Sequence, residues 1–314
     1  MRKNIPDKKN RVTVRVPGTS ANCGPGFDCL GLATTIYNYL DLTLIRSSKV
    51  VVEATGEGAE KIPRGRKNLA WQAVKKLLEV TGHNEFKGAI IRMKNHVPLS
   101  RGLGSSSTAI VAGLTAANEI VGSPLNRHEL LKLATELEGH PDNVAPAIFG
   151  NFTVSVMDGG EVQTFSFRPR IKLKLVVAVP EFELSTKLAR KVLPKKISRS
   201  DAIFNISRAS MLVAALVEGR EELLPLAFDD AIHQPYRKKL VPGMTEVFDA
   251  ARKAGALGAA ISGAGSCLIA FTSAQRGHED EIASAMVEAF KAHGVESKAL
   301  ILNVDTRGAQ VLKR

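Results

Sequence analysis

The stretch that decides the fold runs Pro98-Leu99-Ser100-Arg101-Gly102-Leu103-Gly104-Ser105-Ser106-Ser107-Thr108. It lies between a run typical of a strand, 89–93, and a run typical of a helix, 108–120. Its two glycines allow positive φ and the close approach of another group. The serines and the threonine place hydroxyl groups beside the free N–H groups and the positive dipole end of the helix start. The stretch therefore predicts an anion-binding turn, with phosphate as the best candidate.

Two features of this stretch limit the interpretation. No lysine follows the second glycine, so the stretch is not a Walker A loop. A glycine- and serine-rich turn between a strand and a helix is also often an ordinary connection. The number of hydrogen-bond donors within one short segment favours the anion site.

The composition indicates a soluble α/β protein. The chain has 314 residues, 44% of them hydrophobic, which is enough for two domains or one large one. The N-terminus is basic but lacks the apolar core of a signal peptide. The uncharged run 254–271 is long enough to span a membrane, but it is dominated by glycine, alanine and serine. We interpret it as strand, glycine turn and strand, and expect no membrane partner.

The formal net charge of +12 is compatible with nucleic acid, an anionic membrane surface or small anionic substrates. The basic residues are spread along the chain, and no nucleic-acid motif or interleaved aromatic residues accompany them. We therefore expect no nucleic-acid partner, and a solvated basic surface explains most of the charge.

The chain has three cysteines, and their spacing matches no paired motif. Cys23, Cys29 and Cys267 form no C-x-x-C pair, and each lies in an apolar or glycine-rich context. Such a set predicts reduced thiols in a cytoplasmic protein rather than disulfides. A nucleophilic role is a weaker alternative.

The periodicity of the chain predicts the main elements. Strands are expected at 12–16 (stopped by Pro17), 40–44, 50–52, 89–93, 152–157 and 162–167 (a hairpin around Asp158-Gly159-Gly160), 173–179, 267–271 and 298–304. Helices are expected at 69–80 (capped by Asn68 and ended by Gly82), 108–120, 127–138, 186–193, 201–218, 244–254 and 279–292. Residues 1–10 are expected to form a polar arm and 18–28 a loop. The mixture predicts an α+β protein with one domain at 1–165 and a second at 166–314.

Four segments together resemble the GHMP kinases (galactokinase, homoserine kinase, mevalonate kinase, phosphomevalonate kinase). They are the stretches 14–28, 98–108, 140–147 and 262–265. The second alone identifies only the superfamily, whereas 14–28 and 140–147 resemble the homoserine-kinase branch. The order and spacing of the segments fit across nearly the whole chain.

The resemblance implies a two-domain GHMP kinase fold. Its N-terminal α/β domain is similar to ribosomal protein S5 domain 2, its C-terminal domain is a ferredoxin-like α/β sandwich, and the active site lies between them. It implies transfer of the γ-phosphoryl group of ATP, with Mg²⁺, to the side-chain hydroxyl of L-homoserine. The products would be O-phospho-L-homoserine and ADP, on the route to threonine. A homodimer is common in the family, but the sequence itself does not give the oligomeric state.

By resemblance, the turn 98–108 binds the triphosphate, and Gly263 and Gly265 complete the cleft from the second domain. Ser106 and Glu138 would bind Mg²⁺, because hard oxygen ligands suit that ion. Glu136 is only two residues from Glu138 and competes for that assignment. A plain β-turn and helix-end ion pairs are the structural alternatives.

The amino-acid substrate needs groups of both charges. By resemblance, Arg190 and Arg237 bind its carboxylate, which a guanidinium group can hold through two hydrogen bonds. Asp28 is the candidate for its ammonium group, and Asn22 and Asn143 would orient the hydroxyl or the ammonium. Surface charge for the arginines and turn capping for the other three residues are the alternatives.

The resemblance places Asn143, Thr186 and Arg190 at the reacting centre and implies no dedicated base. Asp142 is the nearest carboxylate, and the γ-phosphate itself would receive the proton, since a loose transition state needs little activation of the nucleophile. His140 is expected either to form a wall of the substrate site or to stabilise a helix C-terminus.

Two other functions remain open from the sequence. The chain could be another GHMP enzyme, of the mevalonate- or shikimate-kinase type, because the two arginines fit any carboxylate. It could also be a sensor that binds a nucleotide and a metabolite without transferring phosphate.

Overall fold

The computed structural model describes residues 10–313; the expected arm at 1–10 lies almost wholly outside them. The strands are β1 (Arg11–Ala21), β2 (Leu30–Ile45), β3 (Val50–Gly56), β4 (Gly88–Asn95), β5 (Phe152–Asp158), β6 (Glu161–Phe167), β7 (Leu173–Pro180), β8 (Gly258–Ile261), β9 (Leu268–Ser273), β10 (Ser297–Asn303) and β11 (Gln310–Lys313). The helices are α1 (Leu69–Thr81), α2 (Ser105–Ile120), α3 (Arg127–Glu138), α4 (Pro141–Phe149), α5 (Thr186–Lys191), α6 (Arg199–Glu218), α7 (Gln234–Arg237), α8 (Met244–Lys253) and α9 (Glu279–Ala292).

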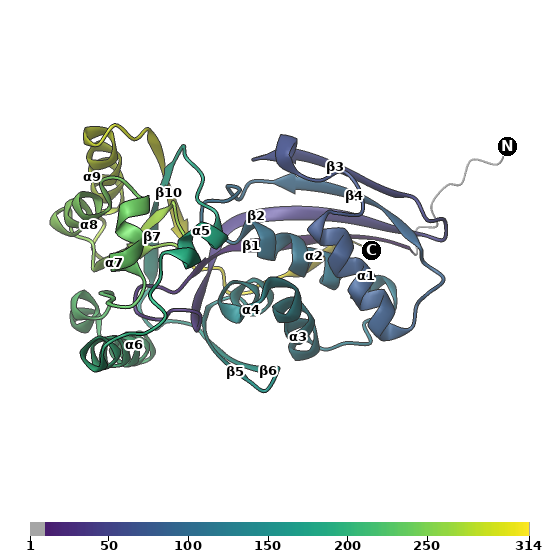
Figure 1. Ribbon diagram of the computed structural model, residues 1–314, viewed down its shortest axis with the longest axis horizontal. Coiled ribbons are helices and arrows are strands. Elements are labelled where there is room, and N and C mark those ends of the chain that lie inside the picture. Colours follow the sequence, from purple (N-terminus) through teal and green to yellow (C-terminus); the bar gives the residue numbers. More distant parts are fainter. Residues whose placement is uncertain (1–9, 314) are drawn as a thin grey trace.

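The first half of the chain forms a sheet covered on one face by helices. The strand order is β11-β1-β2-β4-β3, with β5 paired to β2 and β6 paired to β5. Helices α1 to α4 lie together on one face of this sheet (Figure 1). Val12, Val14 and Val16 of β1 are fully buried against them, as the alternation in the sequence predicts.

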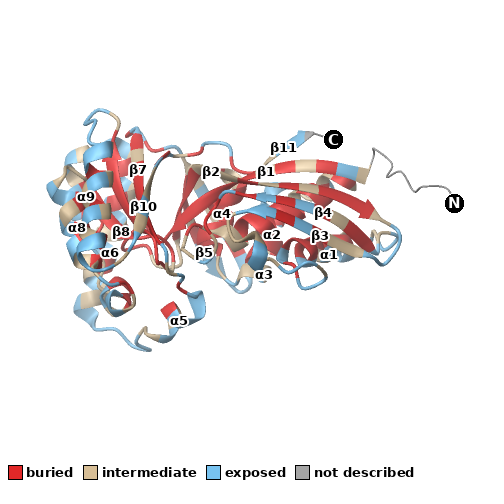
Figure 2. Ribbon diagram, turned by 90° about the horizontal axis from the view of Figure 1, so that it is seen from above, coloured by how far each residue is buried: buried red, intermediate tan, exposed pale blue. Residues whose placement is uncertain are grey.

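The second half forms a smaller sheet with the order β10-β7-β9-β8. Successive residues of β7 point to opposite faces: Val176 packs with α8 and α9, whereas Val177 packs with α6. The core on the α6 side also includes Leu32 of β2 and Phe152 of β5. The two sheets therefore share a core, and buried residues continue from one half into the other (Figure 2). This shared core fixes one half of the molecule against the other.

The domain boundary predicted near residue 165 stays a prediction. β6 belongs to the first sheet and ends at Phe167. After the second sheet, the chain returns to the first, where β11 pairs with β1. A single boundary in the sequence therefore assigns β11 to the second domain, although it pairs in the sheet of the first.

Several local predictions are confirmed. Asn68 caps α1 by accepting hydrogen bonds from Ala70 N and Trp71 N, and Gly82 ends the helix in the left-handed region. α3 spans 127–138, and β5 and β6 form the predicted hairpin. The run 254–271 contains β8, a glycine turn and β9 rather than a membrane helix.

Other local predictions are wrong. Pro17 does not stop β1, which continues to Ala21 because the pairing with β2 shifts register between Pro17 and Thr19. α2 begins at Ser105, three residues earlier than predicted, because Gly104 takes the N-cap position with φ 69°. Helix α4 is missing from the predicted helices, although it starts at Pro141, a favoured first helical residue.

One helix among the described residues, α6, meets the length and hydropathy expected of a membrane span. Its Leu212 and Leu216 pack into the core of the second half, while Ile203 and Ile206 are exposed. Length and composition alone are weak grounds for a membrane helix. The expectation of no membrane partner stays a prediction.

Candidate active site

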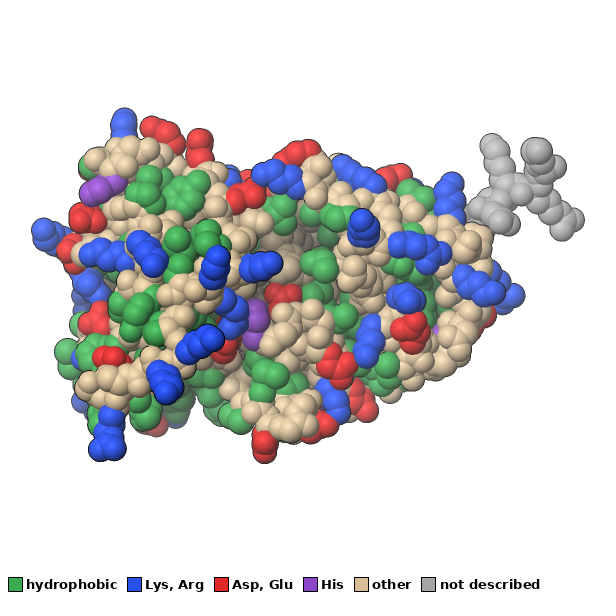
Figure 3. Space-filling view, viewed as in Figure 1, with side chains coloured by type: hydrophobic (Ala, Val, Ile, Leu, Met, Phe, Trp, Pro, Cys, Tyr) green, Lys and Arg blue, Asp and Glu red, His purple; other side chains and the backbone are tan. Residues whose placement is uncertain are grey.

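A pocket of about 260 Å³ lies between the two halves of the molecule. The molecular surface is hollowed at this place (Figure 3). The pocket is lined by Ala21, Asn22, Asp28, Leu99, Ser100, Gly102, Gly104, Ser105, Ser106, Glu138, His140, Asp142, Asn143, Leu184, Ser185, Thr186, Arg190, Arg237, Gly263, Ala264 and Gly265. All the residues predicted outside the phosphate turn therefore line one pocket.

The predicted phosphate turn forms one wall of this pocket. Gly104 is the N-cap of α2 and lines the pocket, so the first turn of that helix, with its free N–H groups, lies at the pocket. A Cβ on Gly104 would lie 2.1 Å from Thr19 Oγ1, and a Cβ on Gly102 would lie 2.0 Å from Ser262 O. Both glycines also have positive φ, so no other residue fits at either position.

Not every residue of the turn faces the pocket. Leu99, Ser100, Gly102, Gly104, Ser105 and Ser106 line it. Pro98, Leu103, Ser107 and Thr108 are buried elsewhere. Arg101 does not line the pocket, because its guanidinium group donates to Pro180 O and Glu181 O in the second half. These five side chains support the turn rather than face the pocket.

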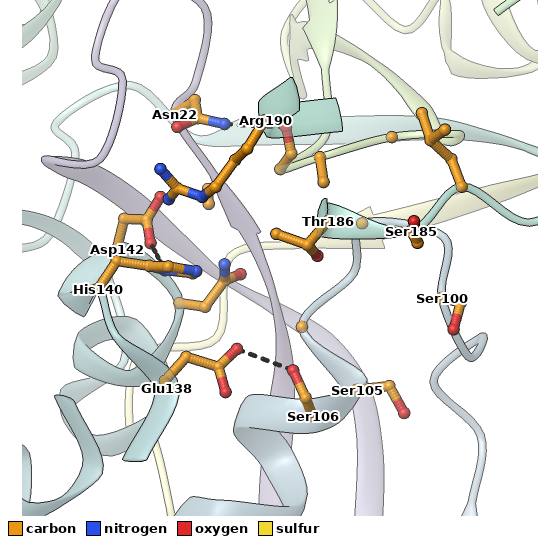
Figure 4. A pocket seen from close by; sticks show the side chains of 18 of the residues that line it. Asn22, Ser100, Ser105, Ser106, Glu138, His140, Asp142, Ser185, Thr186 and Arg190 are labelled. Carbon is orange, nitrogen blue, oxygen red and sulfur yellow. Dashed lines mark hydrogen bonds and ion pairs between the residues drawn. The ribbon is translucent and has the colours of Figure 1, made fainter. Parts of the chain in front are cut away.

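Glu138 and Glu136 have different surroundings. Glu138 Oε1 accepts hydrogen bonds from Ser106 Oγ at 2.8 Å and Ser107 Oγ at 2.9 Å. Glu136 is exposed outside the pocket and forms an ion pair with Lys76 at 3.0 Å. Glu138 and Ser106 lie across the pocket from Asn22 and Arg190 (Figure 4). The geometry therefore favours Glu138 for the predicted metal role.

Arg190 of the second half and Asp28 of the first half bind each other in the pocket. Arg190 Nη1 and Nη2 donate to the two carboxylate oxygens of Asp28 at 2.9 and 2.6 Å. The hydrogen bond and charge of Asp28 raise the pKa of Arg190 despite partial burial. The sequence predicted that the two residues would bind opposite ends of a substrate. In this structure each neutralises the other.

Arg237 is held from several sides. Its side chain is 2% exposed, and it donates to Ala189 O at 3.2 Å and Gly263 O at 3.0 Å. Burial and the neighbouring Arg190 lower its pKa to about 10, so it stays charged at neutral pH. The guanidinium groups of Arg190 and Arg237 lie 5.4 and 5.3 Å from the ring centroid of Phe27. The two cations therefore share one aromatic neighbour.

The two predicted asparagines have different roles. Asn22, with φ 69°, accepts a hydrogen bond from Asp28 N and donates one to Gly263 O. It therefore ties its loop to the 262–265 turn of the second half, the capping role that the sequence left as its alternative. Asn143 Oδ1 accepts a hydrogen bond from Thr19 Oγ1 at 2.8 Å, and no protein partner for its amide nitrogen is found among residues 10–313. Its amide group can donate into the pocket.

His140 and Asp142 form a hydrogen-bonded pair at 2.6 Å, which Figure 4 shows at one end of the pocket. Burial lowers the pKa of His140, but the hydrogen bond and charge of Asp142 outweigh it and raise the pKa above 6.5. Asp142 is 2% exposed and lies in the first turn of α4. The carboxylate expected from the sequence to lie nearest the reacting centre is therefore already hydrogen-bonded to a histidine.

We expect NMR titration to give His140 a pKa above its ordinary value, and Asp142→Asn to lower it. Because the pKa is raised in the folded state, the stabilisation by this pair is complete below pH 6.5. It is lost as the pH rises through the folded-state pKa. An unchanged His140 titration in Asp142→Asn would contradict this coupling.

Sequence reasoning missed three residues that hold the site in place: Thr19, Phe27 and His233. Phe27 stacks on His233 at 5.3 Å between ring centroids, and His233 contacts both Gly24 and Arg237. Thr19 and Phe27 lie inside the quoted segment 14–28, but their contacts are with other protein groups, Asn143 and His233. Lone residues of these types give no local signal in a sequence.

Comparison with known proteins agrees with this geometry. Residues 68–151 match the GHMP kinases N terminal domain, and residues 211–292 match the GHMP kinases C terminal. A homoserine kinase of Desulfitobacterium hafniense is 42% identical over 96% of this chain and 100% of its own length. A homoserine kinase of Trichormus variabilis is 44% identical over 95% of this chain and 98% of its own length.

The chain belongs to the GHMP kinase family. The crystal structure of a homoserine kinase from Cytophaga hutchinsonii has a TM-score of 0.89 with 31% identity, covering 99% of this chain and 100% of that one. A mevalonate kinase at 16% identity has a TM-score of 0.69 and supports the fold alone. The predicted two-domain GHMP kinase fold is thereby confirmed.

Proposed function

We propose that this protein is a homoserine kinase, which transfers the γ-phosphoryl group of ATP to the side-chain hydroxyl of L-homoserine and releases O-phospho-L-homoserine and ADP. One observation supports the proposal most. The anion-binding turn, a carboxylate and two guanidinium groups line a single pocket. A phosphate chain and a zwitterionic amino acid can therefore be held side by side.

The nucleotide is placed along the turn 98–108. The N–H groups at the start of α2 and the hydroxyls of Ser105 and Ser106 face the pocket and suit a triphosphate. Gly263 and Gly265 lie in the turn 262–265, which also lines the pocket and packs against the phosphate turn, since a Cβ on Gly263 would lie 3.1 Å from Gly102 O. The second half of the chain therefore borders the pocket beside the phosphate turn.

Mg²⁺ is assigned to Ser106 and Glu138. Both offer hard oxygen ligands, already within hydrogen-bond distance of each other, and both face the pocket. No group of three or more His, Cys, Asp or Glu side chains suited to a metal occurs among residues 10–313. That fits an ion held by one or two protein groups, with phosphate and water as the other ligands. When bound, the ion neutralises charge on the phosphates.

The amino acid is placed among the charged side chains of the pocket. Arg190 and Arg237 bind its carboxylate, Asp28 binds its ammonium group, and Asn143 donates to an oxygen at the reacting centre. Thr186 lines the pocket at the start of α5 and joins Asn143 and Arg190 there. Asn22 fixes the loop that holds Asp28.

No carboxylate is assigned as a general base. Removal of a general base typically lowers kcat by at least about 10²-fold. Asp142→Asn is therefore expected to lower kcat by less than about 10²-fold. Asp142 accepts from His140 instead, so the substitution should act mainly on that pair. Steady-state assay of the folded variant checks this. Loss of all turnover with homoserine binding intact would assign Asp142 as the base.

The proposed function is tested by ADP release with a panel of acceptors. L-homoserine should give turnover with the highest kcat/KM, and L-serine and L-threonine serve as shorter and branched controls. Preference for mevalonate or shikimate would indicate another GHMP activity. Nucleotide binding without turnover on any acceptor would indicate a sensor. A cytoplasmic location and a homodimer belong to the same proposal, and sedimentation analysis tests the dimer.

A further inference from the structure

A histidine with no assigned role lies behind the proposed amino-acid pocket. His233 precedes α7, and its side chain is fully buried. It does not line the pocket. Its ring lies between the loop 22–28 of the first half and Arg237 of the second half. A buried imidazole at such a junction needs partners on both ring nitrogens.

Both partners are present, and they determine the tautomer. Arg237 Nη1 lies 3.3 Å from His233 Nδ1, and a guanidinium group can only donate. Nδ1 is therefore the acceptor. Nε2 must then carry the hydrogen, which it donates to Gly24 O at 2.7 Å. The neutral imidazole thus connects the backbone of one half to the cation of the other.

Further contacts hold the imidazole and the loop together. Phe27, next to Asp28, stacks on the His233 ring with an interplanar angle of 29°. Asp230 accepts hydrogen bonds from the backbone N–H groups of His233 and Gln234. Asn205 of α6 donates to both Asp230 and Pro25 O. The loop is therefore supported by the second half at two successive carbonyl groups.

We infer that His233 is a positioning residue that sets the distance between Arg237 and the loop bearing Asp28, and so matches the pocket to a zwitterion. The identity of the substrate in this inference rests on the proposed function. The hydrogen bonds of His233 do not depend on it. His233 does not itself line the pocket, so it acts only through Arg237 and the loop.

An acid–base role for His233 does not fit the same observations. Burial lowers its pKa to about 4, so the ring stays neutral throughout the physiological range. The nearby carboxylate of Asp230 lies 3.6 Å from Nε2 but is itself buried and bound to four N–H groups. The charged groups around the ring are thus Asp230, Arg237 and, through Phe27, Asp28 and Arg190.

Two substitutions test the inference. His233→Gln retains a donor and an acceptor on one side chain, whereas His233→Phe retains only the ring. We expect His233→Phe to raise the KM for L-homoserine at least about tenfold, as loss of these hydrogen bonds implies, with kcat and the KM for ATP within about threefold. His233→Gln should stay near the wild type. The exposed His293→Gln is the control and should change nothing.

Two results would overturn the inference: an unchanged homoserine KM in folded His233→Phe, or equal KM increases in folded His233→Gln and His233→Phe. If His233→Phe does not fold, ¹⁵N NMR of the wild-type imidazole decides. Protonation at Nε2 with an unprotonated Nδ1 from pH 5.5 to 8 supports the bridge, and the opposite tautomer overturns it. Because that spectrum needs no activity, it separates this inference from failure of the proposed kinase function.

Discussion

Replacing Glu138 with glutamine is expected to lower kcat about 10²–10³-fold, the scale on which loss of transition-state charge stabilisation acts. Glutamine keeps the size of the side chain and can still accept from Ser106 and Ser107. It removes the negative charge that would hold Mg²⁺ beside the phosphates. The fold should therefore survive while phosphoryl transfer fails.

Glu136→Gln provides the matched control for this prediction. Glu136 lies two residues earlier on the same helix, is exposed, and pairs with Lys76 outside the pocket. An isolated surface ion pair contributes only about 0–1 kcal/mol, so this variant should keep wild-type kcat and stability. Titration of Mg²⁺ during steady-state assay measures both variants. Equal kcat values for the two variants would remove Glu138 from the metal site.

Replacing Arg190 with glutamine is expected to raise the KM for L-homoserine about 100-fold, which corresponds to about 2.8 kcal/mol. A hydrogen bond to a charged group contributes about 1.5–3 kcal/mol, and a guanidinium group makes two such bonds to a carboxylate. The substitution also leaves Asp28 without its partner. The KM for ATP should change little, because Arg190 lies across the pocket from the phosphate turn.

Lys191→Gln is the control for Arg190. It removes a neighbouring cation from the last turn of the same short helix, but its side chain is exposed and does not line the pocket. Its KM values should match those of the wild type. A homoserine KM that rises equally in both variants would show a general charge effect rather than binding by Arg190.

The Asp28–Arg190 pair adds a requirement for both charges on the substrate. A ligand with only a carboxylate must separate the pair and leave Asp28 alone, whereas a zwitterion gives each residue a new partner. The separated charge is then compensated on both sides. In the proposed function, this exchange would account for two residues predicted to bind opposite ends of one molecule being bound to each other.

The parts of the site that depend on local chemistry could be predicted from the sequence. Gly102 and Gly104 need positive φ, and the serines lie at a helix start, so the phosphate turn is encoded within eleven residues. The shared pocket of Asn22, Glu138, Arg190 and Arg237 followed from the family resemblance and not from their spacing.

The remaining features depend on contacts that are distant in sequence. Arg101 turns away from the pocket because carbonyl groups of β7 and the following residue accept its hydrogen bonds. β11 joins β1 across nearly the whole chain, and β1 passes Pro17 only through its irregular pairing with β2. His233 has no sequence signal, since its partners Gly24 and Phe27 lie about 200 residues earlier. Tertiary pairing overrides local preference in each case.

The most direct test is a crystal structure of the protein with L-homoserine and a non-hydrolysable ATP analogue. We expect the triphosphate against the turn 98–108, the homoserine carboxylate on Arg190 and Arg237, and its hydroxyl between Asn143 and the γ-phosphate. Homoserine bound outside this pocket, or a triphosphate away from Gly104, would contradict the account.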